Sequence, residues 1–348
     1  FKAENVVDFA WFAGDDMIEV HQSITLDNGH PVDLHYYAPK DYALNDVKVA
    51  DSLVPQLEGV VNNNLSPIEM LERAVRFYSG AVAPYPYPQV SVVVGPLNTG
   101  SGMEYPMITL VGPTTSAMSL DRVIAHEVGH NWFQGILGYN ERRSPYLDEG
   151  INSFYENKYM DDHYGMENRD FQVMAARTDL DLNQLLYLGA YQRGDLVPVD
   201  AHTHDMDVIQ YYFNGYMIPP SLFQKLEEVT GPEQFRENMK AFYDEFKFSH
   251  PTIDDMRRIF EANDPESRNF GWFFDEILST INPFDMAITD VSTRGDEYQL
   301  TLENHGQFPA PAVVKAYDGT KVVMTRTADT FQGTTTVSFP IDDYDYFA

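Results

Sequence analysis

One pentapeptide constrains this chain more than any other feature, because it places two imidazoles and a carboxylate on a single turn of helix. It reads His126-Glu127-Val128-Gly129-His130. Residues four positions apart lie on the same face of a helix, so the two histidines can reach the same ion. Glu127 lies beside the first histidine and can contact a water at that ion without binding the ion. The pattern predicts a metal site on a helix that runs from a cap at Ser119 to about Gly135.

A third ligand is expected on the next helix. Ser144-Pro145 marks the start of that helix, because proline is common at the first helical position. Glu149 lies in its first turn, nineteen residues after His130. Two histidines and one glutamate form a catalytic zinc site with a fourth position open for water. Taken alone, this glutamate would be interpreted as a charge that stabilises a helix N-terminus. Glu156 follows on the same helical face, either as a hydrogen-bond acceptor for a ligand imidazole or as a plain surface acid.

Composition narrows the remaining classes of function. The 348 residues include 23 Lys and Arg against 53 Asp and Glu, a net charge of −30, and no cysteine. Thiolate-bound zinc and iron–sulfur clusters are therefore excluded, and any metal must be held by His, Asp or Glu. Such an acidic chain would be repelled by nucleic acid and by anionic lipid. No apolar run approaches the roughly 18 residues of a membrane span.

The hydrophobic pattern predicts a mixed α+β chain in three parts. Strands are expected at 18–21, 32–36, 90–94 and 104–111, with a helix at 66–79. Residues 119–285 are mainly helical, with later helical patterns at 207–229, 233–246, 252–262 and 268–280. After Pro283 the pattern changes to short strands, at 298–302, 313–317 and 322–324, with a hairpin turn at Asp318-Gly319. Residues 286–348 therefore form a small separate β domain.

Two further motifs, in the expected order, make the chain resemble the aminopeptidase N family of zinc metallopeptidases, which are gluzincins. Gly100-Ser101-Gly102-Met103-Glu104-Tyr105-Pro106 lies upstream of the zinc helix, where the family has Gly-x-Met-Glu. Tyr212-Phe213-Asn214-Gly215 follows the third ligand, where the family has Tyr-x-x-Gly. Glu149 stands in the Leu-Asp-Glu-Gly setting of that family. After the glutamate of this motif, the chain has Tyr105-Pro106 where the commonest family form has Asn. The Tyr-Pro form is associated with bacterial members of the family.

The resemblance implies a thermolysin-like catalytic domain over residues 1–285, with a β-rich lobe at 1–118 and a helical lobe at 119–285. A small β-sandwich domain at 286–348 follows it. The family's amino-terminal β domain, which walls the substrate pocket, is expected to be absent from this chain.

The resemblance also implies the roles of the site residues. His126, His130 and Glu149 would hold one Zn²⁺ per chain. Glu127 would be the general base, and Tyr212 would stabilise the oxyanion, although Tyr211 is directly adjacent. Glu104, with Gly102 and Met103, would bind the free α-ammonium of a peptide.

The sequence thus predicts a zinc aminopeptidase that acts on peptides with free amino termini. Two alternatives stay open: a thermolysin-like endopeptidase, and a non-catalytic peptide-binding module that retains the peptidase fold. A carboxylate at Glu104 disfavours the endopeptidase, because a blocked amino end would leave that carboxylate unpaired. The acidic surface, the absence of cysteine and the bacterial motif variant favour an exported or cell-envelope enzyme of a bacterium.

Overall fold

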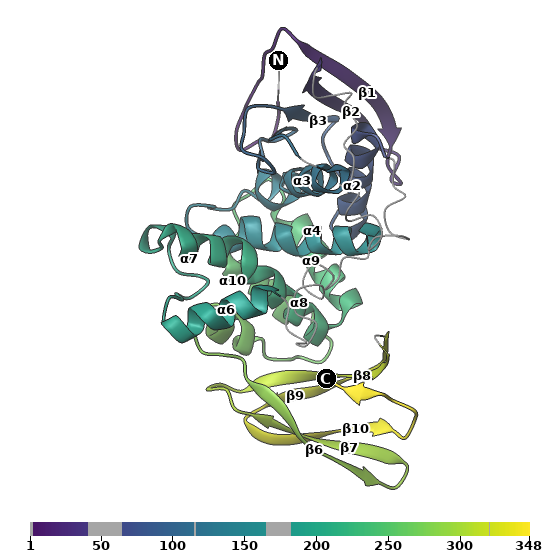
Figure 1. Ribbon diagram of the computed structural model, residues 1–348, viewed down its shortest axis with the longest axis vertical. Helices are drawn as coiled ribbons and strands as arrows, with labels where there is room; N and C mark the ends of the chain where they lie inside the picture. Colours follow the sequence, from purple (N-terminus) through teal and green to yellow (C-terminus); the bar gives the residue numbers. More distant parts are fainter. Residues whose placement is uncertain (1–2, 41–64, 115, 165–181, 320) are drawn as a thin grey trace.

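The computed structural model describes residues 3–40, 65–114, 116–164, 182–319 and 321–348. A sheet lies at one end of the molecule, helices occupy the middle, and a second group of strands lies at the other end (Figure 1). The predicted mixed α+β class is confirmed. The domain boundaries at residues 118 and 285 stay predictions.

The first sheet has five strands in the order β1-β2-β3-β5-β4. Their bounds are Met17–Thr25 (β1), Pro31–Pro39 (β2), Gln89–Val94 (β3), Gly102–Met103 (β4) and Ile108–Val111 (β5). β1 and β2 form an antiparallel hairpin, β3 and β5 continue the sheet in parallel, and β4 pairs antiparallel with β5 at the edge. Alternate residues of β2 are buried, as a strand with one face on the core requires.

The strand predicted over 104–111 is wrong in its first half. β4 ends at Met103, and β5 begins only at Ile108. Met107 has a φ of 62°, a left-handed conformation that a strand does not accommodate. Glu104 therefore follows the edge strand instead of lying within a strand, and its side chain is half-buried.

Two helices pack between this sheet and the rest of the molecule: α2 (Pro67–Ala81) and α3 (Ala117–Gly129). The predicted start of α2 is confirmed, because Ser66 precedes it and donates its backbone N–H to the Glu69 carboxylate at 2.8 Å. The predicted cap of α3 at Ser119 is wrong. Ser116 has an extended backbone and its Oγ accepts the N–H of Ser119 at 3.1 Å, so Ser116 is the cap.

Further helices build the middle layer around one continuous apolar core. They are α4 (Ile151–Tyr164), α6 (Leu182–Arg193), α7 (Val208–Tyr212), α8 (Pro219–Thr230), α9 (Pro232–Phe246) and α10 (Ile253–Asn263). π-helical turns occur at Asn131–Ile136, Tyr146–Gly150, Phe213–Met217 and Trp272–Ile277, and a 3₁₀ turn at Thr203–Asp205. Among the described residues, no helix has the length and apolar character that crossing a membrane requires.

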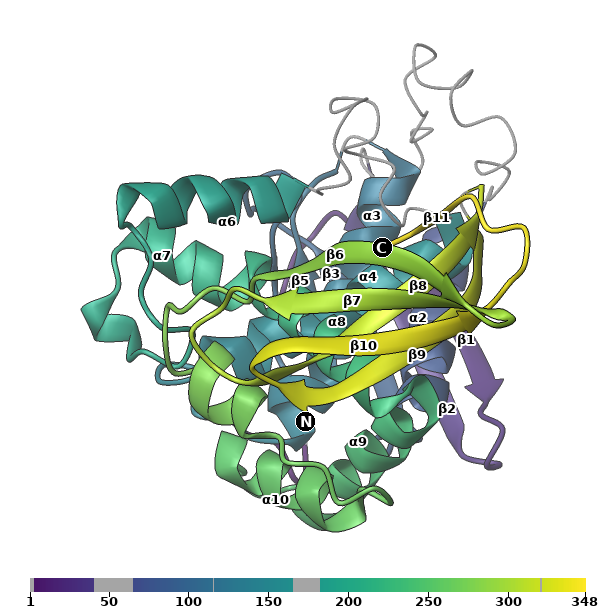
Figure 2. The same ribbon diagram turned by 90° about the horizontal axis from the view of Figure 1, so that it is seen from below.

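From Met286 onward the described chain forms strands. They are β6 (Met286–Arg294), β7 (Glu297–Asn304), β8 (Ala310–Asp318), β9 (Lys321–Phe331), β10 (Gly333–Pro340) and β11 (Tyr346–Phe347). Two three-stranded sheets result, in the orders β10-β7-β6 and β11-β8-β9, and residues of both share one apolar cluster. Figure 2 shows these strands crossing the end of the helical layer. Lys315 on β8 contacts Glu228 on α8 at 2.6 Å, which joins the two parts.

Candidate metal centre

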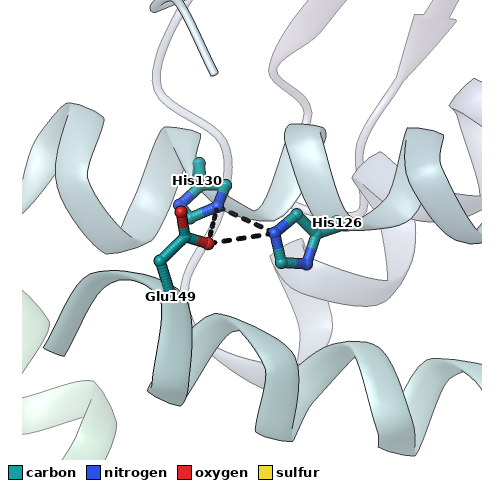
Figure 3. Close-up of side chains that lie close together, drawn as sticks. All are labelled: His126, His130 and Glu149. Carbon is teal, nitrogen blue, oxygen red and sulfur yellow. Dashed lines mark hydrogen bonds and ion pairs between the residues drawn. The ribbon is translucent and has the colours of Figure 1, made fainter. Parts of the chain in front are cut away.

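Three side chains from two neighbouring helical segments converge on one point (Figure 3). His126 and His130 lie one turn apart on α3, and Glu149 extends from the π-helical turn Tyr146–Gly150 that continues into α4. Nε2 of His126 is 3.1 Å from Nε2 of His130, and each of these atoms is 3.1 Å from Oε2 of Glu149. The three donor atoms thus form a nearly equilateral triangle.

This triangle fits a tetrahedral zinc ion. Zn–N and Zn–O bonds of about 2.0–2.1 Å place neighbouring donor atoms about 3.3 Å apart. The chemistry of the donors agrees with the geometry, since the Nδ1 atom of each histidine lies against another carboxylate. A proton on each Nδ1 leaves both Nε2 lone pairs directed at each other and at a carboxylate oxygen. In that tautomer, a cation bound between the three acceptors would satisfy all of them.

A second layer of carboxylates fixes the two imidazoles. Glu156 Oε2 lies 2.8 Å from Nδ1 of His126, and Asp148 Oδ1 lies 2.7 Å from Nδ1 of His130. Arg122 in turn pairs with Glu156. Such contacts set the orientation and tautomer of a metal-binding histidine. Asp148 was not predicted from the sequence, although an acid directly before a ligand glutamate is the signal that could have identified it.

The electrostatics of the cluster favour a positive charge at the centre of the triangle. Burial alone would lower the pKa of His126, but hydrogen bonds to Glu149 and Glu156 outweigh burial and raise it to about 10. Burial alone would raise the pKa of Glu149, yet the His130 imidazole and hydrogen bonds from both histidines hold it well below its ordinary value. A proton or a divalent cation can supply the charge that these groups stabilise.

Glu127 lies next to the triangle but outside it. Its side chain is 4% exposed, and burial raises its pKa to about 8 against the opposing effect of the two imidazoles. Oε1 lies against the backbone of the edge strand: a Cβ on Gly102 would come within 2.1 Å of it. Oε2 is buried and has no hydrogen-bond partner among the described residues. Gly102 thus leaves room for a carboxylate with one oxygen unengaged.

Glu104 also lies close to the triangle. It follows β4, and oxygen atoms of Glu104, Asp148 and Glu149 lie within 4.8 Å of one another. Met103, half-buried, is the residue of β4 that pairs with Leu110. A carboxylate so placed stabilises a cationic group beside the metal position.

A second acid near this point was not predicted from the sequence. Glu141 is half-buried, and burial together with the charge of Glu104 raises its pKa. Gln134, whose φ is 150°, donates to Oε2 of Glu141 at 3.4 Å. Glu141 increases the negative charge that a bound cationic group would meet.

The predicted oxyanion tyrosine, Tyr212, contacts the site through Tyr216. Tyr212 ends α7 and is 55% exposed, with its ring stacked on Tyr216 at 5.6 Å between centroids. Tyr211 is half-buried, and burial, with the charges of Glu149 and Asp148, raises its pKa to about 12. Tyr216 makes the direct contact, because its hydroxyl donates to Oε1 of Glu149. It lies in the π-helical turn that follows Tyr212, and the sequence analysis did not identify it.

Comparisons with known proteins identify the family of the chain. The chain matches the family described as the Peptidase family M1 domain over residues 67–277. It is 24% identical to leukotriene A-4 hydrolase of Xenopus laevis over 70% of this chain and 42% of that protein. It is 20% identical to tricorn protease-interacting factor F2 of Thermoplasma acidophilum over 81% of this chain and 37% of that protein. The chain therefore spans less than half the length of these curated relatives.

A solved structure has the same fold. The crystal structure of Legionella pneumophila aminopeptidase A in complex with aspartic acid aligns with a TM-score of 0.63 and 14% identity. The alignment covers 93% of this chain and 36% of that one.

Proposed function

The chain belongs to peptidase family M1, and from this premise we propose that it is a zinc aminopeptidase that removes amino-terminal residues from peptides. The observation that supports this proposal best is the pairing of the His126, His130 and Glu149 triangle with a carboxylate, Glu104, a few ångströms away. The triangle accounts for the hydrolysis, and Glu104 accounts for the selection of a free amine.

In this proposal His126, His130 and Glu149 hold one zinc ion per chain. When bound, zinc acidifies a water molecule and polarises the carbonyl of the bond to be cleaved. The protein residues keep the ligands in place: Glu156 and Asp148 bind the Nδ1 atoms, so both Nε2 lone pairs stay directed at the metal position.

Glu127 acts as the general base. A buried carboxylate with one oxygen unengaged can take a proton on Oε2 and return it to the leaving amine. The two imidazoles oppose the burial that raises the pKa of Glu127, and a bound metal ion would favour its ionised form further. Gly102 leaves room for this carboxylate, since the side chain of any larger residue would occupy the position of Oε1.

Glu104 binds the α-ammonium of the substrate and so limits cleavage to the first peptide bond. A charge-assisted contact of this kind contributes about 1.5–3 kcal/mol when water is excluded. Asp148 and Glu149 lie within reach of the same position and add to the negative potential there. An endopeptidase would have to place an uncharged amide against these carboxylates, and this cost disfavours that alternative.

Tyr212 completes the proposed machinery by donating its hydroxyl to the oxyanion of the tetrahedral intermediate. Its exposed ring at the end of α7 leaves the hydroxyl accessible to a substrate. Tyr211 stays the alternative, because the charges of Glu149 and Asp148 act on its hydroxyl.

The decisive test compares Glu104→Gln with the unchanged protein on matched peptides with free and acetylated amino termini. We expect the variant to keep its zinc, to show a KM raised by roughly ten- to a hundredfold for free peptides, and to lose its discrimination against acetylated ones. Glu69→Gln, on the distant cap of α2, is the control. Equal cleavage of both peptides by the unchanged protein would favour the endopeptidase, and no cleavage by a zinc-loaded protein would favour a binding module.

A further inference from the structure

The two oxygens of the Glu149 carboxylate have different partners. Oε2 completes the triangle with His126 and His130, at 3.1 Å from each Nε2 atom. Oε1 accepts the hydroxyl hydrogen of Tyr216. A glutamate ligand can bind a metal through one oxygen or through both, and Tyr216 engages the oxygen that the triangle does not use.

We propose that Tyr216 is a positioning residue that restricts Glu149 to one metal-binding oxygen and so preserves the open fourth position. This inference rests on the proposed zinc site. With Oε1 committed to the phenol, the carboxylate cannot rotate that oxygen into the space that a water or a substrate carbonyl must occupy. Outer partners of this kind control the orientation of ligands in metal sites generally.

The local fold brings Tyr216 within reach of the ligand. Tyr216 lies in the π-helical turn Phe213–Met217, which packs on the turn that carries Glu149. Gly150 allows this close approach, because a Cβ there would come within 3.0 Å of the Gly215 carbonyl oxygen and 2.5 Å of Pro219 Cβ. The close packing of these two turns therefore sets the distance between the Tyr216 hydroxyl and the Glu149 carboxylate.

Ring contacts then hold the phenol in one orientation. The Tyr216 ring lies at a centroid distance of 6.2 Å from His126, tilted by 22°, and at 5.6 Å from Tyr212, tilted by 27°. Tyr211 contacts its edge at 6.5 Å. The ring is therefore held between a ligand and the two tyrosines that compete for the oxyanion role. A phenylalanine can keep these ring contacts while losing only the hydroxyl.

The experiment measures zinc affinity directly, by competition between the protein and a fluorescent zinc chelator. We expect Tyr216→Phe to bind zinc about tenfold more weakly than the unchanged protein, since loss of an outer partner costs about 10–100-fold in metal affinity. Tyr212→Phe is the matched control, because it also removes one hydroxyl from the same cluster, and its zinc affinity should stay unchanged. With Co²⁺ in place of zinc, Tyr216→Phe should alter the visible absorption spectrum, because a second carboxylate oxygen changes the coordination number.

Kinetics supply an independent readout in the zinc-saturated proteins. Tyr216→Phe should lower kcat and leave KM nearly unchanged, because Glu104 and the remaining substrate contacts are intact. Unchanged zinc affinity together with an unchanged Co²⁺ spectrum would overturn the inference, as would an equal loss of affinity in Tyr212→Phe. His130→Ala, measured in parallel, separates a failure of the positioning role from a failure of the proposed zinc site. If it loses zinc while Tyr216→Phe does not, only the positioning role fails. If it binds zinc normally, the proposed metal site fails.

Discussion

The metal-ligand side of the site and the tyrosine side are built in different ways. On the ligand side, His130 is 1% exposed and Glu149 8%, and each histidine has a carboxylate behind it. On the tyrosine side, α7 has only five residues, and Val208 is 82% exposed. A buried cluster of paired charges resists displacement, whereas a short exposed helix opens at low cost. Substitutions on the ligand side should therefore change metal content, and those of the exposed helix α7 should change only the rate.

The largest effect is expected from removing a ligand. His130→Ala leaves two of three donors and an unpaired Asp148, so the chain should lose most of its zinc. The unchanged protein should carry about one equivalent, measured by elemental analysis of the purified chain. His21→Ala, on the exposed strand β1, is the control and should keep its full zinc content. Full zinc occupancy in His130→Ala would show that the ligand set is wrong.

The next largest effect is expected from replacing Glu127, the proposed general base. Glu127→Gln keeps the ligands and removes proton transfer, so zinc content should stay unchanged while kcat falls by roughly 10²–10⁴ or more. Gly102→Ala should produce the same division between binding and turnover, because the added Cβ would displace Oε1 of Glu127. If Glu127→Gln lost its zinc together with its activity, Glu127 would instead belong to the ligand set.

A smaller effect is expected on the tyrosine side. Tyr212→Phe should lower kcat by about 10²–10³ with unchanged zinc content, if the phenol stabilises the oxyanion. Tyr211→Phe, one residue away, is the matched comparison and should keep most of the activity. The reverse result, measured as kcat on the same peptide, would transfer the role to Tyr211.

The convergence of His126, His130 and Glu149 follows from spacing on α3 and from a ligand on the next helical segment. A spacing of four residues on α3 brings His126 and His130 together, and Glu149 is positioned by a helix start that Ser144-Pro145 indicates. Glu156 follows Glu149 by two turns and contacts His126, as one of its two interpretations required.

The tyrosine side could not be derived in the same way. Helical periodicity predicted one helix over 207–229, whereas the structure has α7, a π-helical turn and α8. The wider turn shifts each later side chain around the helix axis, so spacing from Tyr212 does not fix where Tyr216 points. The break in the strand predicted over 104–111 has a similar origin, because nothing in the hydrophobic pattern marks the left-handed backbone at Met107.

The smallest effect compares one capping interaction on each side. Asp207 caps α7, where its Oδ1 accepts the N–H groups of Ile209 and Gln210 at 2.8 Å each, and Ser116 caps α3. Loss of either cap costs about 0.5–2 kcal/mol of helix stability, but the two costs should appear in different measurements. α3 lies in the core, so Ser116→Ala should lower the free energy of unfolding of the whole protein by about 1 kcal/mol.

α7 is short and exposed, so Asp207→Ala should act locally. Amide hydrogen exchange should accelerate at Tyr211 and Tyr212 by roughly five- to tenfold for about 1 kcal/mol, with the free energy of unfolding nearly unchanged. Peptide turnover should fall by a few-fold at most, because α7 is still folded most of the time. Zinc affinity should match that of the unchanged protein. A fall in global stability equal to that of Ser116→Ala would show that α7 unfolds together with the core. The distinction between a rigid ligand side and a locally opening tyrosine side would then be wrong.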